Sequence, residues 1–568
     1  MPNANRPMFR AALVLALLAM LSSGWTSQVH AAKRTVCTIT VNSDDERNAF
    51  RKYLPPDDYE FVELVERGRP DWLASACSKG IRCDMLVISG HFNGSDFFSD
   101  QVDVGEYLPV AEIERASCSE SCPALMSQLK EVYLFGCDTL NGESVRSASA
   151  DMLRSMVGSG RSPSEPELRM QGLAARSGES NRDVMRRVFV DVPAIYGFSS
   201  VAPLGSTAGP ILSRYLQAAP RGAVGGGRPN RRLLDTFATH SMTVAAGLTR
   251  TDARAAHRAE VCRFVDDRTS AAQKLDFVHG LLRRDMAEMR PFFDRIERLL
   301  AALPESVRQS SAFTTALDRI ARDDATRARF LAFARDADSA ASRIRMIDVA
   351  RTLGWLSAEE QRSERVQALL DLLARPAMTA ADVGLACAMN RDRGYDAELV
   401  RFRQAASNGG TAGHVAALAC LGSPDEHARM LLALASSNER DLGMAEVYIH
   451  HRPIRVASEL RNLAAGIVRM TRPEAQVRAL NALARQSLVD EESLAELMRL
   501  FASAELVNVQ RAVAGVFLRS DHGAIATPAL VRALREHRLS TSGPVDIIDA
   551  LIRRLERAVT VAEVGVRR

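Results

Sequence analysis

Short apolar runs alternate with amphipathic segments in the first third of the chain. Five runs rich in β-branched and aromatic residues have polar or glycine-containing boundaries and predict buried strands. They cover residues 34–43, 59–66, 83–91, 131–139 and 192–200. Helical patterns separate them. Strands that alternate with helices indicate an α/β domain with a mostly parallel sheet and helices on both faces.

The pattern changes at about residue 252, and apolar residues then recur at spacings of three and four almost to the C-terminus. Several segments show an Ala/Leu-rich helix, a turn with Gly, Asp or Pro, and a second Leu-rich helix. The irregular period of roughly 30–45 residues resembles degenerate HEAT repeats. An irregular helical bundle would give much the same pattern. We therefore expect an all-α region, either solenoid-like or a bundle.

These patterns divide the 568 residues into four parts, and a chain of this length is too long for one hydrophobic core. Residues 32–218 form the predicted α/β domain, and residues 252–568 form the helical region. Between them, residues 219–251 predict a linker and connecting segment, because the first part is rich in Gly and Arg without an apolar period. Residues 1–31 predict a signal peptide.

The signal peptide is predicted from three features of the N-terminus. Two arginines and no acid precede the apolar run "AALVLALLAMLSS", and Val29 and Ala31 suit cleavage after Ala31. An uncleaved membrane anchor is the alternative, but the run is shorter than the ~20 residues that a span needs. We expect an exported protein, periplasmic or secreted, with no membrane partner after cleavage.

The cysteines are the most informative feature of the composition. With 46% hydrophobic and 25% charged residues and a net charge of +4, the chain is an ordinary globular protein with no sign of a nucleic-acid partner. It has nine cysteines, so disulfides in an exported chain leave at least one thiol over. Local spacing suggests the pairs Cys77–Cys83 and Cys118–Cys122, and a zinc site is the competing interpretation.

Two of the predicted strands end on a reactive side chain. "LVISGHFNG" places His91 after one apolar run, and "VYLFGCDTLNG" places Cys137 after another, 46 residues later. On neighbouring parallel strands both side chains would lie at the carboxyl edge of the sheet, where ligands of such sheets bind. A cysteine nucleophile needs a partner histidine and backbone N–H groups that stabilise an oxyanion.

The two motifs resemble those of the caspase-like cysteine peptidases, which include caspases, gingipains, separases and the bacterial CHAT peptidases. The resemblance covers about residues 34–218. It implies a cysteine endopeptidase, a hydrolase, with Cys137 as the nucleophile and His91 as its activating or polarising partner. The oxyanion would be held by the backbone N–H groups of Cys137 and of Phe92, which stands where the family usually has Gly.

The resemblance also implies where a substrate side chain would bind. In this family the pocket is built partly by the strand after the nucleophile and its following loop, here residues 195–206. Asp138, Ser199 and Ser200 are the candidate pocket residues, and the same serines suit a solvated strand end equally well. We assign no cofactor and no metal, and we expect a protein or peptide substrate.

A second class of function fits the same sequence. The α/β domain would then be a catalytically inactive caspase-like scaffold, and the helical region would present a surface to a protein partner. In the enzyme hypothesis that region recruits substrate or restrains the active site.

Overall fold

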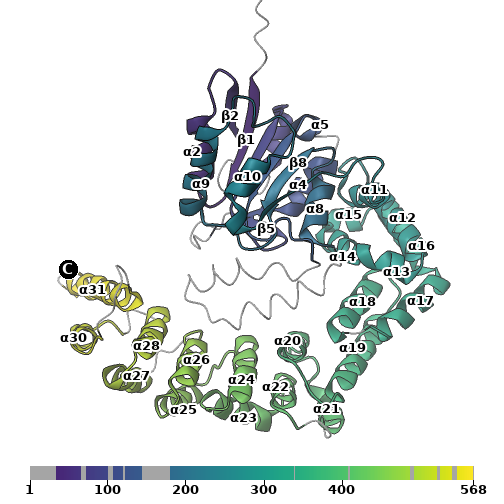
Figure 1. Cartoon of the computed structure of the whole chain (residues 1–568). Coiled ribbons are helices and arrows are strands. Elements are labelled where there is room, and N and C mark those ends of the chain that lie inside the picture. The colour runs from purple at the N-terminus through teal and green to yellow at the C-terminus, as the bar shows by residue number, and fades with distance from the viewer. Residues whose placement is uncertain are drawn as a thin grey trace, which may run out of the picture.

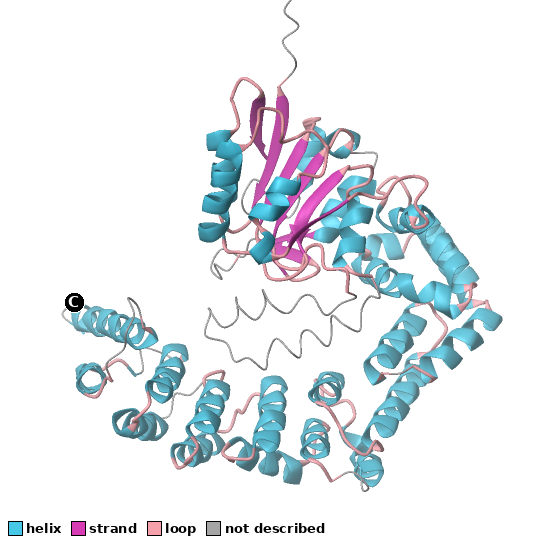
Figure 2. Cartoon of the chain, viewed as in Figure 1, coloured by secondary structure: helices cyan, strands magenta, loops and turns pink. Residues whose placement is uncertain are grey.

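The computed structural model describes residues 33–64, 72–99, 107–118, 122–143, 179–337, 339–406, 410–486, 491–520, 525–539 and 546–566. The predicted signal peptide lies outside the described residues. An N-terminal α/β domain is followed by a long all-helical region, which confirms the predicted fold class (Figures 1 and 2).

The main sheet has six strands in the order β2-β1-β3-β7-β8-β9, and only β9 is antiparallel to its neighbour. The strands are β1 (Arg34–Thr40), β2 (Tyr59–Glu63), β3 (Met85–Ser89), β7 (Glu131–Phe135), β8 (Ala194–Phe198) and β9 (Met242–Ala245). Every residue of β3, β7 and β8 is buried. Such continuous burial is typical of central strands in a sheet covered on both faces.

Helices cover the two faces of this sheet. Buried side chains of α2 (Asp45–Tyr53), α9 (Gly205–Ala218) and α10 (Arg231–Thr236) share one core cluster with the sheet. The cluster on the other face includes α3 (Trp72–Ser78), α4 (Val110–Cys118), α5 (Pro123–Met126) and α8 (Asn181–Val188). A small antiparallel sheet, β4 (His91–Phe92), β5 (Asp96–Phe98) and β6 (Tyr107–Pro109), follows β3.

The helical region forms an arc that begins beside the α/β domain (Figure 1). Its helices are α11 (Ala255–Val265), α12 (Ala271–Leu282), α13 (Met286–Met289), η3 (Arg290–Phe292), α14 (Phe293–Ala302), α15 (Glu305–Arg308), α16 (Ser311–Ala321), α17 (Asp324–Arg335), α18 (Ala340–Thr352), α19 (Ala358–Leu373), α20 (Ala380–Met389), η4 (Asp396–Glu398), α21 (Leu399–Ala405), α22 (Ala412–Cys420), α23 (Pro424–Leu434), α24 (Glu439–His451), α25 (Ala457–Val468), α26 (Pro473–Leu483), α27 (Glu491–Ser503), α28 (Val507–Arg519), α30 (Pro528–Glu536) and α31 (Ile547–Val566).

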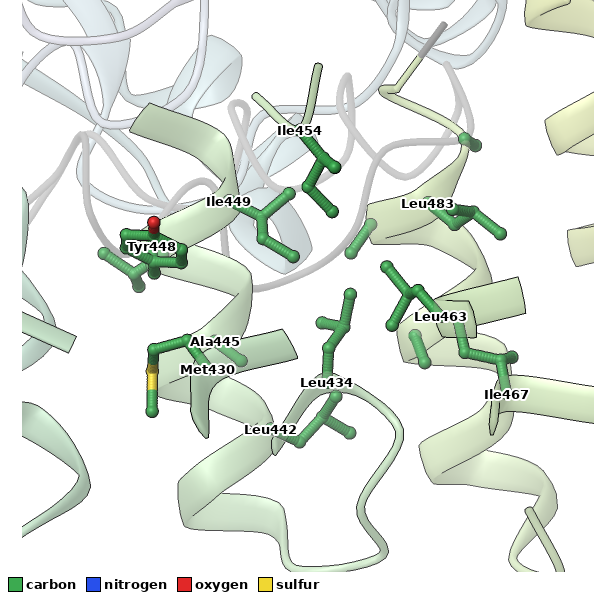
Figure 3. Close-up of a cluster of buried hydrophobic side chains, with 14 of the residues drawn as sticks. Met430, Leu434, Leu442, Ala445, Tyr448, Ile449, Ile454, Leu463, Ile467 and Leu483 are labelled. Carbon is green, nitrogen blue, oxygen red and sulfur yellow. The ribbon is translucent and has the colours of Figure 1, made fainter. Parts of the chain in front are cut away.

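Helices in the later part of the arc stack in two layers. In one layer α22, α24, α26, α28 and α31 each contact the next, and in the other α23, α25, α27 and α30 do so. Apolar side chains fill the space between the layers, as around Leu434, Leu442 and Leu463 (Figure 3). The helices are therefore stacked along a line and not gathered around one centre.

The segment predicted as a linker and connecting segment is hydrogen-bonded to the α/β domain. The backbone carbonyl of Val224 accepts hydrogen bonds from the Tyr59 hydroxyl and the Arg34 guanidinium. The N–H groups of Gly225 and Gly227 donate to the buried carboxylate of Glu131 at 2.8 and 3.0 Å. Both glycines have positive φ angles, so they let the backbone turn toward that carboxylate. The segment continues into α10, the short helix η2 (Ala238–His240) and β9, and so completes the α/β domain.

The predicted local disulfides Cys77–Cys83 and Cys118–Cys122 are wrong, and four other pairs form. They are Cys37–Cys83, Cys77–Cys122, Cys118–Cys262 and Cys387–Cys420. The first joins β1 to Cys83, two residues before the adjacent β3, and the second joins α3 to Cys122, which directly precedes α5 on the same face of the sheet. Adjacency in the fold, and not spacing in the sequence, decides these pairs. They also remove the cysteines that a zinc site would use.

Four disulfides indicate that the chain folds in an oxidising compartment outside the cytoplasm. Within the described ranges, none of the helices has the length and apolar character required to cross a membrane.

Buried charges and a disulfide join the two parts of the chain. Cys118 on α4 is bonded to Cys262 on α11. Glu114 of α4 pairs with Arg187 of α8 and with Arg295 of α14, the latter at 3.1 Å. Both Glu114 and Arg187 are buried. The start of the helical arc is therefore fixed covalently and electrostatically to the α/β domain.

Candidate active site

The ends of β3 and β7 meet at the carboxyl edge of the sheet. The two strands are parallel neighbours with Ser89 opposite Phe135, and the N–H of Gly90 donates to the Phe135 carbonyl at 3.1 Å. His91 and Cys137 each come two residues after this aligned pair. The structure therefore brings both predicted residues to one edge, on adjacent strand ends.

Gly136 permits this close approach of the two strand ends. A Cβ at this position would lie 2.8 Å from the Gly90 carbonyl oxygen and 2.9 Å from the Phe92 Cβ. Real Cβ atoms do not tolerate such distances to backbone, so a larger residue would push the strand ends apart.

Cys137 is buried, with 1% of its surface exposed, on the sheet face that α2 and α9 cover. Its Sγ accepts a hydrogen bond from the backbone N–H of Ala202 at 3.0 Å. An N–H donor stabilises a negatively charged sulfur more than a neutral one. All nine cysteines lie in the described part of the chain, and Cys137 is the only one outside a disulfide.

His91 opens β4 and is 7% exposed, with its ring centroid 5.5 Å from that of Phe98. The next side chain, Phe92, packs against Phe97 with ring centroids 4.8 Å apart. Phe92 belongs to the core cluster on the α3–α5 face, whereas Cys137 belongs to the cluster on the opposite face. The Phe92 ring therefore packs on the opposite face of the sheet from Cys137.

The turn after Cys137 is held tightly by the neighbouring strand. Asp138 has a φ angle of +59°, a left-handed conformation that aspartate tolerates better than most residues. Its N–H donates to the Ser200 carbonyl at 2.8 Å, and its carboxylate accepts from the Asn141 amide at 3.2 Å. Asp138 is buried, so this candidate pocket residue is turned into the structure.

The two candidate pocket serines lie in the loop that borders Cys137. Ser199 and Ser200 are both exposed. The Ser199 hydroxyl donates to the Ser241 carbonyl at 3.2 Å, and the Ser200 carbonyl holds Asp138. The structure therefore brings residues 199–202 beside the cysteine, while the Ser199 hydroxyl is already used to anchor the loop.

Glu46 is a buried acid at the same edge that the sequence analysis did not single out. It lies in the first turn of α2, is 3% exposed, and its carboxyl is close to the Ser89 side chain. Burial is the largest influence and raises the pKa of Glu46 to about 7. It shares the buried face of α2 with Ala49 and Phe50, at helical spacing. Glu46 could have been recognised in the sequence as an acidic residue on the apolar face of a predicted helix.

We expect Glu46→Gln to stabilise the α/β domain by about 3 kcal/mol at pH 8 and to change little near pH 4. The unfolded carboxyl ionises near its ordinary pKa of 4.5, whereas the folded one holds its proton to about pH 7. Wild-type stability therefore falls as pH rises from 4.5 to 7, and the full penalty remains above 7. Glutamine carries no charge, so the Glu46→Gln variant does not lose this stability at high pH. Denaturant unfolding between pH 4 and 8 measures the difference.

The exposed change Glu474→Gln is the matched control, since it removes one carboxylate from the surface of α26. A stabilisation by Glu46→Gln that is equal at pH 4 and pH 8 would contradict the argument from burial.

The candidate active site is identified from the positions of its residues in the structure. Comparison of the chain with protein-family models, with curated proteins and with solved structures gives no match. Within the described ranges, no group of three or more His, Cys, Asp and Glu side chains could hold a metal ion.

Proposed function

We propose that the chain is an exported cysteine endopeptidase of the caspase-like class, acting in the periplasm or after secretion. One observation carries the proposal: the one cysteine outside a disulfide and a histidine follow aligned residues of adjacent parallel strands. Ligands of parallel α/β sheets bind at this edge. The motifs around His91 and Cys137 resemble those of the same class.

In this proposal the Cys137 thiolate attacks the carbonyl carbon of the scissile peptide. The C–N bond of the tetrahedral intermediate then breaks, His91 gives a proton to the leaving amine, and a thioester to Cys137 remains. Water hydrolyses the thioester and restores the thiol. The backbone N–H groups of Cys137 and Phe92 are the proposed oxyanion donors, and the Ala202 N–H stabilises the thiolate between turnovers.

The helical arc has a proposed role in substrate recruitment. The carboxyl ends of the parallel strands point toward the space that the arc borders (Figure 1). A protein bound on the inner side of the arc would therefore meet the edge that carries His91 and Cys137. Stacked helix pairs of this kind provide extended concave binding surfaces.

A second function is favoured by the burial of the sulfur. With 1% of its surface exposed, Cys137 cannot contact a peptide carbonyl unless the chain around it moves. An inactive scaffold whose helical arc binds a protein partner would not need that movement.

Alkylation of the unreduced protein with iodoacetamide separates the two functions. Eight cysteines are in disulfides, so Cys137 is the one thiol that reacts. A cysteine activated by a histidine is a thiolate at pH 6, whereas an ordinary thiol is almost fully protonated. We expect the native protein to react at least about tenfold faster than glutathione at pH 6, and His91→Ala to remove that advantage.

Labelling that occurs only after unfolding in guanidinium would oppose the peptidase and favour the scaffold. The buried His414 of α22 provides the control His414→Ala, because it lies in the helical arc. This variant should alkylate at the wild-type rate.

A further inference from the structure

A cavity of about 290 Å³ lies at the amino edge of the main sheet, opposite the edge that carries His91 and Cys137. The segment between α9 and α10 lines it, and this segment is bonded to Glu131 and Arg34, the first residues of β7 and β1. The volume is close to the lower limit of the ~300–1,000 Å³ typical of small-molecule sites. It therefore suits one small chemical group and not a large cofactor.

The surroundings of the cavity are positively charged. Arg228 and Arg231 line it, and no acidic residue does so in the described part of the chain. Residues 219–232 contain four arginines and no Asp or Glu. Among the described residues, neither the Arg228 nor the Arg231 side chain forms a hydrogen bond or an ion pair. Because arginine is charged throughout the physiological pH range, two such side chains beside one cavity favour an anionic ligand.

Hydrogen bonds hold the backbone around the cavity in one arrangement. The Asn230 N–H donates to the Tyr196 hydroxyl at 2.9 Å, and the Asn230 side chain donates to the Tyr215 hydroxyl at 2.6 Å. The Tyr196 hydroxyl in turn donates to the Arg228 carbonyl at 3.1 Å. On the inner side of the segment, two glycine N–H groups donate to the Glu131 carboxylate. The backbone that carries both arginines is therefore fixed in advance, which lowers the entropic cost of binding a ligand.

The available donors favour a phosphate group over other small anions. A guanidinium group presents paired N–H donors that match two oxygens of one phosphate or carboxylate. A phosphate monoester has three terminal oxygens and nearly two negative charges at neutral pH, so it offers acceptors to both arginines, whereas a carboxylate has two oxygens and one charge. Gly226 also lines the cavity, and its N–H has no partner in the described ranges, so it supplies a further donor.

We propose that this cavity binds the phosphate group of a monoester, held by Arg228 and Arg231. The site is separate from the candidate active site and does not depend on the proposed peptidase function. A soluble phosphorylated molecule and a lipid with a terminal phosphate present the same group, and the experiment distinguishes these two sources.

The test titrates the full-length oxidised protein with glycerol 3-phosphate in a calorimeter, with acetate as the carboxylate probe. We expect saturable binding of glycerol 3-phosphate that is at least about tenfold tighter than that of acetate. Arg228→Gln/Arg231→Gln should weaken this binding by at least about tenfold, because two charge-assisted hydrogen bonds are lost. The matched control Arg391→Gln/Arg393→Gln removes two exposed arginines from the loop after α20 and should bind like the wild type.

A second variant tests the cavity without changing its charge. Gly226 has no positive φ angle, and a Cβ there would lie 3.6 Å from the Gly222 carbonyl oxygen, which is an ordinary contact. Gly226→Leu should therefore fold, fill part of the cavity and weaken binding of the phosphate ester by a similar factor. Hydrogen exchange of residues 219–232 at the wild-type level shows that the segment is intact, and a variant that meets this condition decides the test.

Vesicles with and without phosphatidic acid distinguish the two sources of the phosphate. Sedimentation with phosphatidic acid vesicles that is lost in Arg228→Gln/Arg231→Gln assigns a lipid, whereas binding of the soluble ester alone assigns a soluble ligand. Acetate that binds as tightly as the ester, or an equal loss of binding in the Arg391→Gln/Arg393→Gln control, would overturn the proposal. Absence of binding to both glycerol 3-phosphate and the vesicles would overturn it as well.

Discussion

Cys137→Ala is expected to abolish every cut that the wild-type protein makes in a mixed peptide library read by mass spectrometry. Without the sulfur no thioester can form, and the remaining oxyanion donors have no nucleophile to assist. His91→Ala should lower the cleavage rate by about 10²- to 10⁴-fold, the usual contribution of a positioned acid–base group. Cys137 packs among the apolar side chains of the sheet core. Alanine at this site therefore leaves a small cavity and not an unpaired charge.

Two further variants make the result specific. Cys137→Ser keeps the size of the side chain but supplies a much poorer nucleophile, so it should be as inactive as Cys137→Ala. His414→Ala removes a buried histidine whose ring bonds Thr411 and the Arg375 carbonyl in the helical region. It should cleave normally. If Cys137→Ala retained the wild-type cuts, the proposed catalytic role of this residue would be disproved.

Much of the α/β fold could be predicted because fully buried strands are visible in the sequence as continuous apolar runs. β3 and β7 are continuous apolar runs, and the structure buries both completely. β9 was missed because only its two end residues are buried, so its four residues show no period that separates them from a loop. β4 and β5 have two and three residues, too few for an alternation to be recognised.

The hydrogen bonds that hold the predicted linker to the α/β domain could not be predicted, for a different physical reason. Glycine and arginine in residues 219–232 suggested exposed chain, because such residues rarely build a core. The acceptor that holds this segment, the Glu131 carboxylate, begins a strand 94 residues before Gly225. No local pattern contains the information that these two parts meet. The same reasoning explains the disulfides, such as Cys118–Cys262, with a separation of 144 residues.

The candidate site was predictable only to the level of strand ends. Topology alone places the residues after two parallel strands at one edge, and the register of β3 and β7 does so here. The contact of Ala202 with Cys137 and the approach of Glu46 to Ser89 depend on how α9 and α2 pack. The direction of the Phe92 ring likewise follows from the alternation of side chains in β4, which the sequence did not reveal as a strand.

The junction between the two parts of the chain matters for the proposed function, because it fixes the arc relative to the carboxyl edge of the sheet. Arg258 of α11 donates to the backbone carbonyls of Arg187 and Ser117, both at 3.1 Å. Arg187 pairs with Glu114 and, at 2.9 Å, with Glu179. These bonds connect α4, α8 and α11 in one buried network, so a defect in one member should loosen all three helices.

Arg187→Ala is expected to destabilise this junction by about 3–5 kcal/mol. Among the described residues, the change leaves the buried Glu114 carboxylate with Arg295 as its one charged partner, and it opens a cavity under α8. Hydrogen exchange of peptides from α4 and α8, read by mass spectrometry, measures the loss of stability of these two helices directly. A single global unfolding curve would be less informative for a chain with two structural parts. The disulfide Cys118–Cys262 should keep the two parts together while α8 exchanges faster.

A surface ion pair supplies the matched control for this prediction. Arg472 and Glu439 lie 3.4 Å apart with side chains 55% and 71% exposed, and such pairs contribute about 0–1 kcal/mol. Arg472→Ala should therefore leave the exchange of α26, which begins at the next residue, nearly unchanged. The triple variant Arg187→Met/Glu114→Gln/Arg295→Met removes the three charges of this cluster together and should cost less than Arg187→Ala alone. An equal or larger cost would show that packing, and not the uncompensated charge, determines the stability of the junction, and the arc would then be oriented mainly by its apolar contacts.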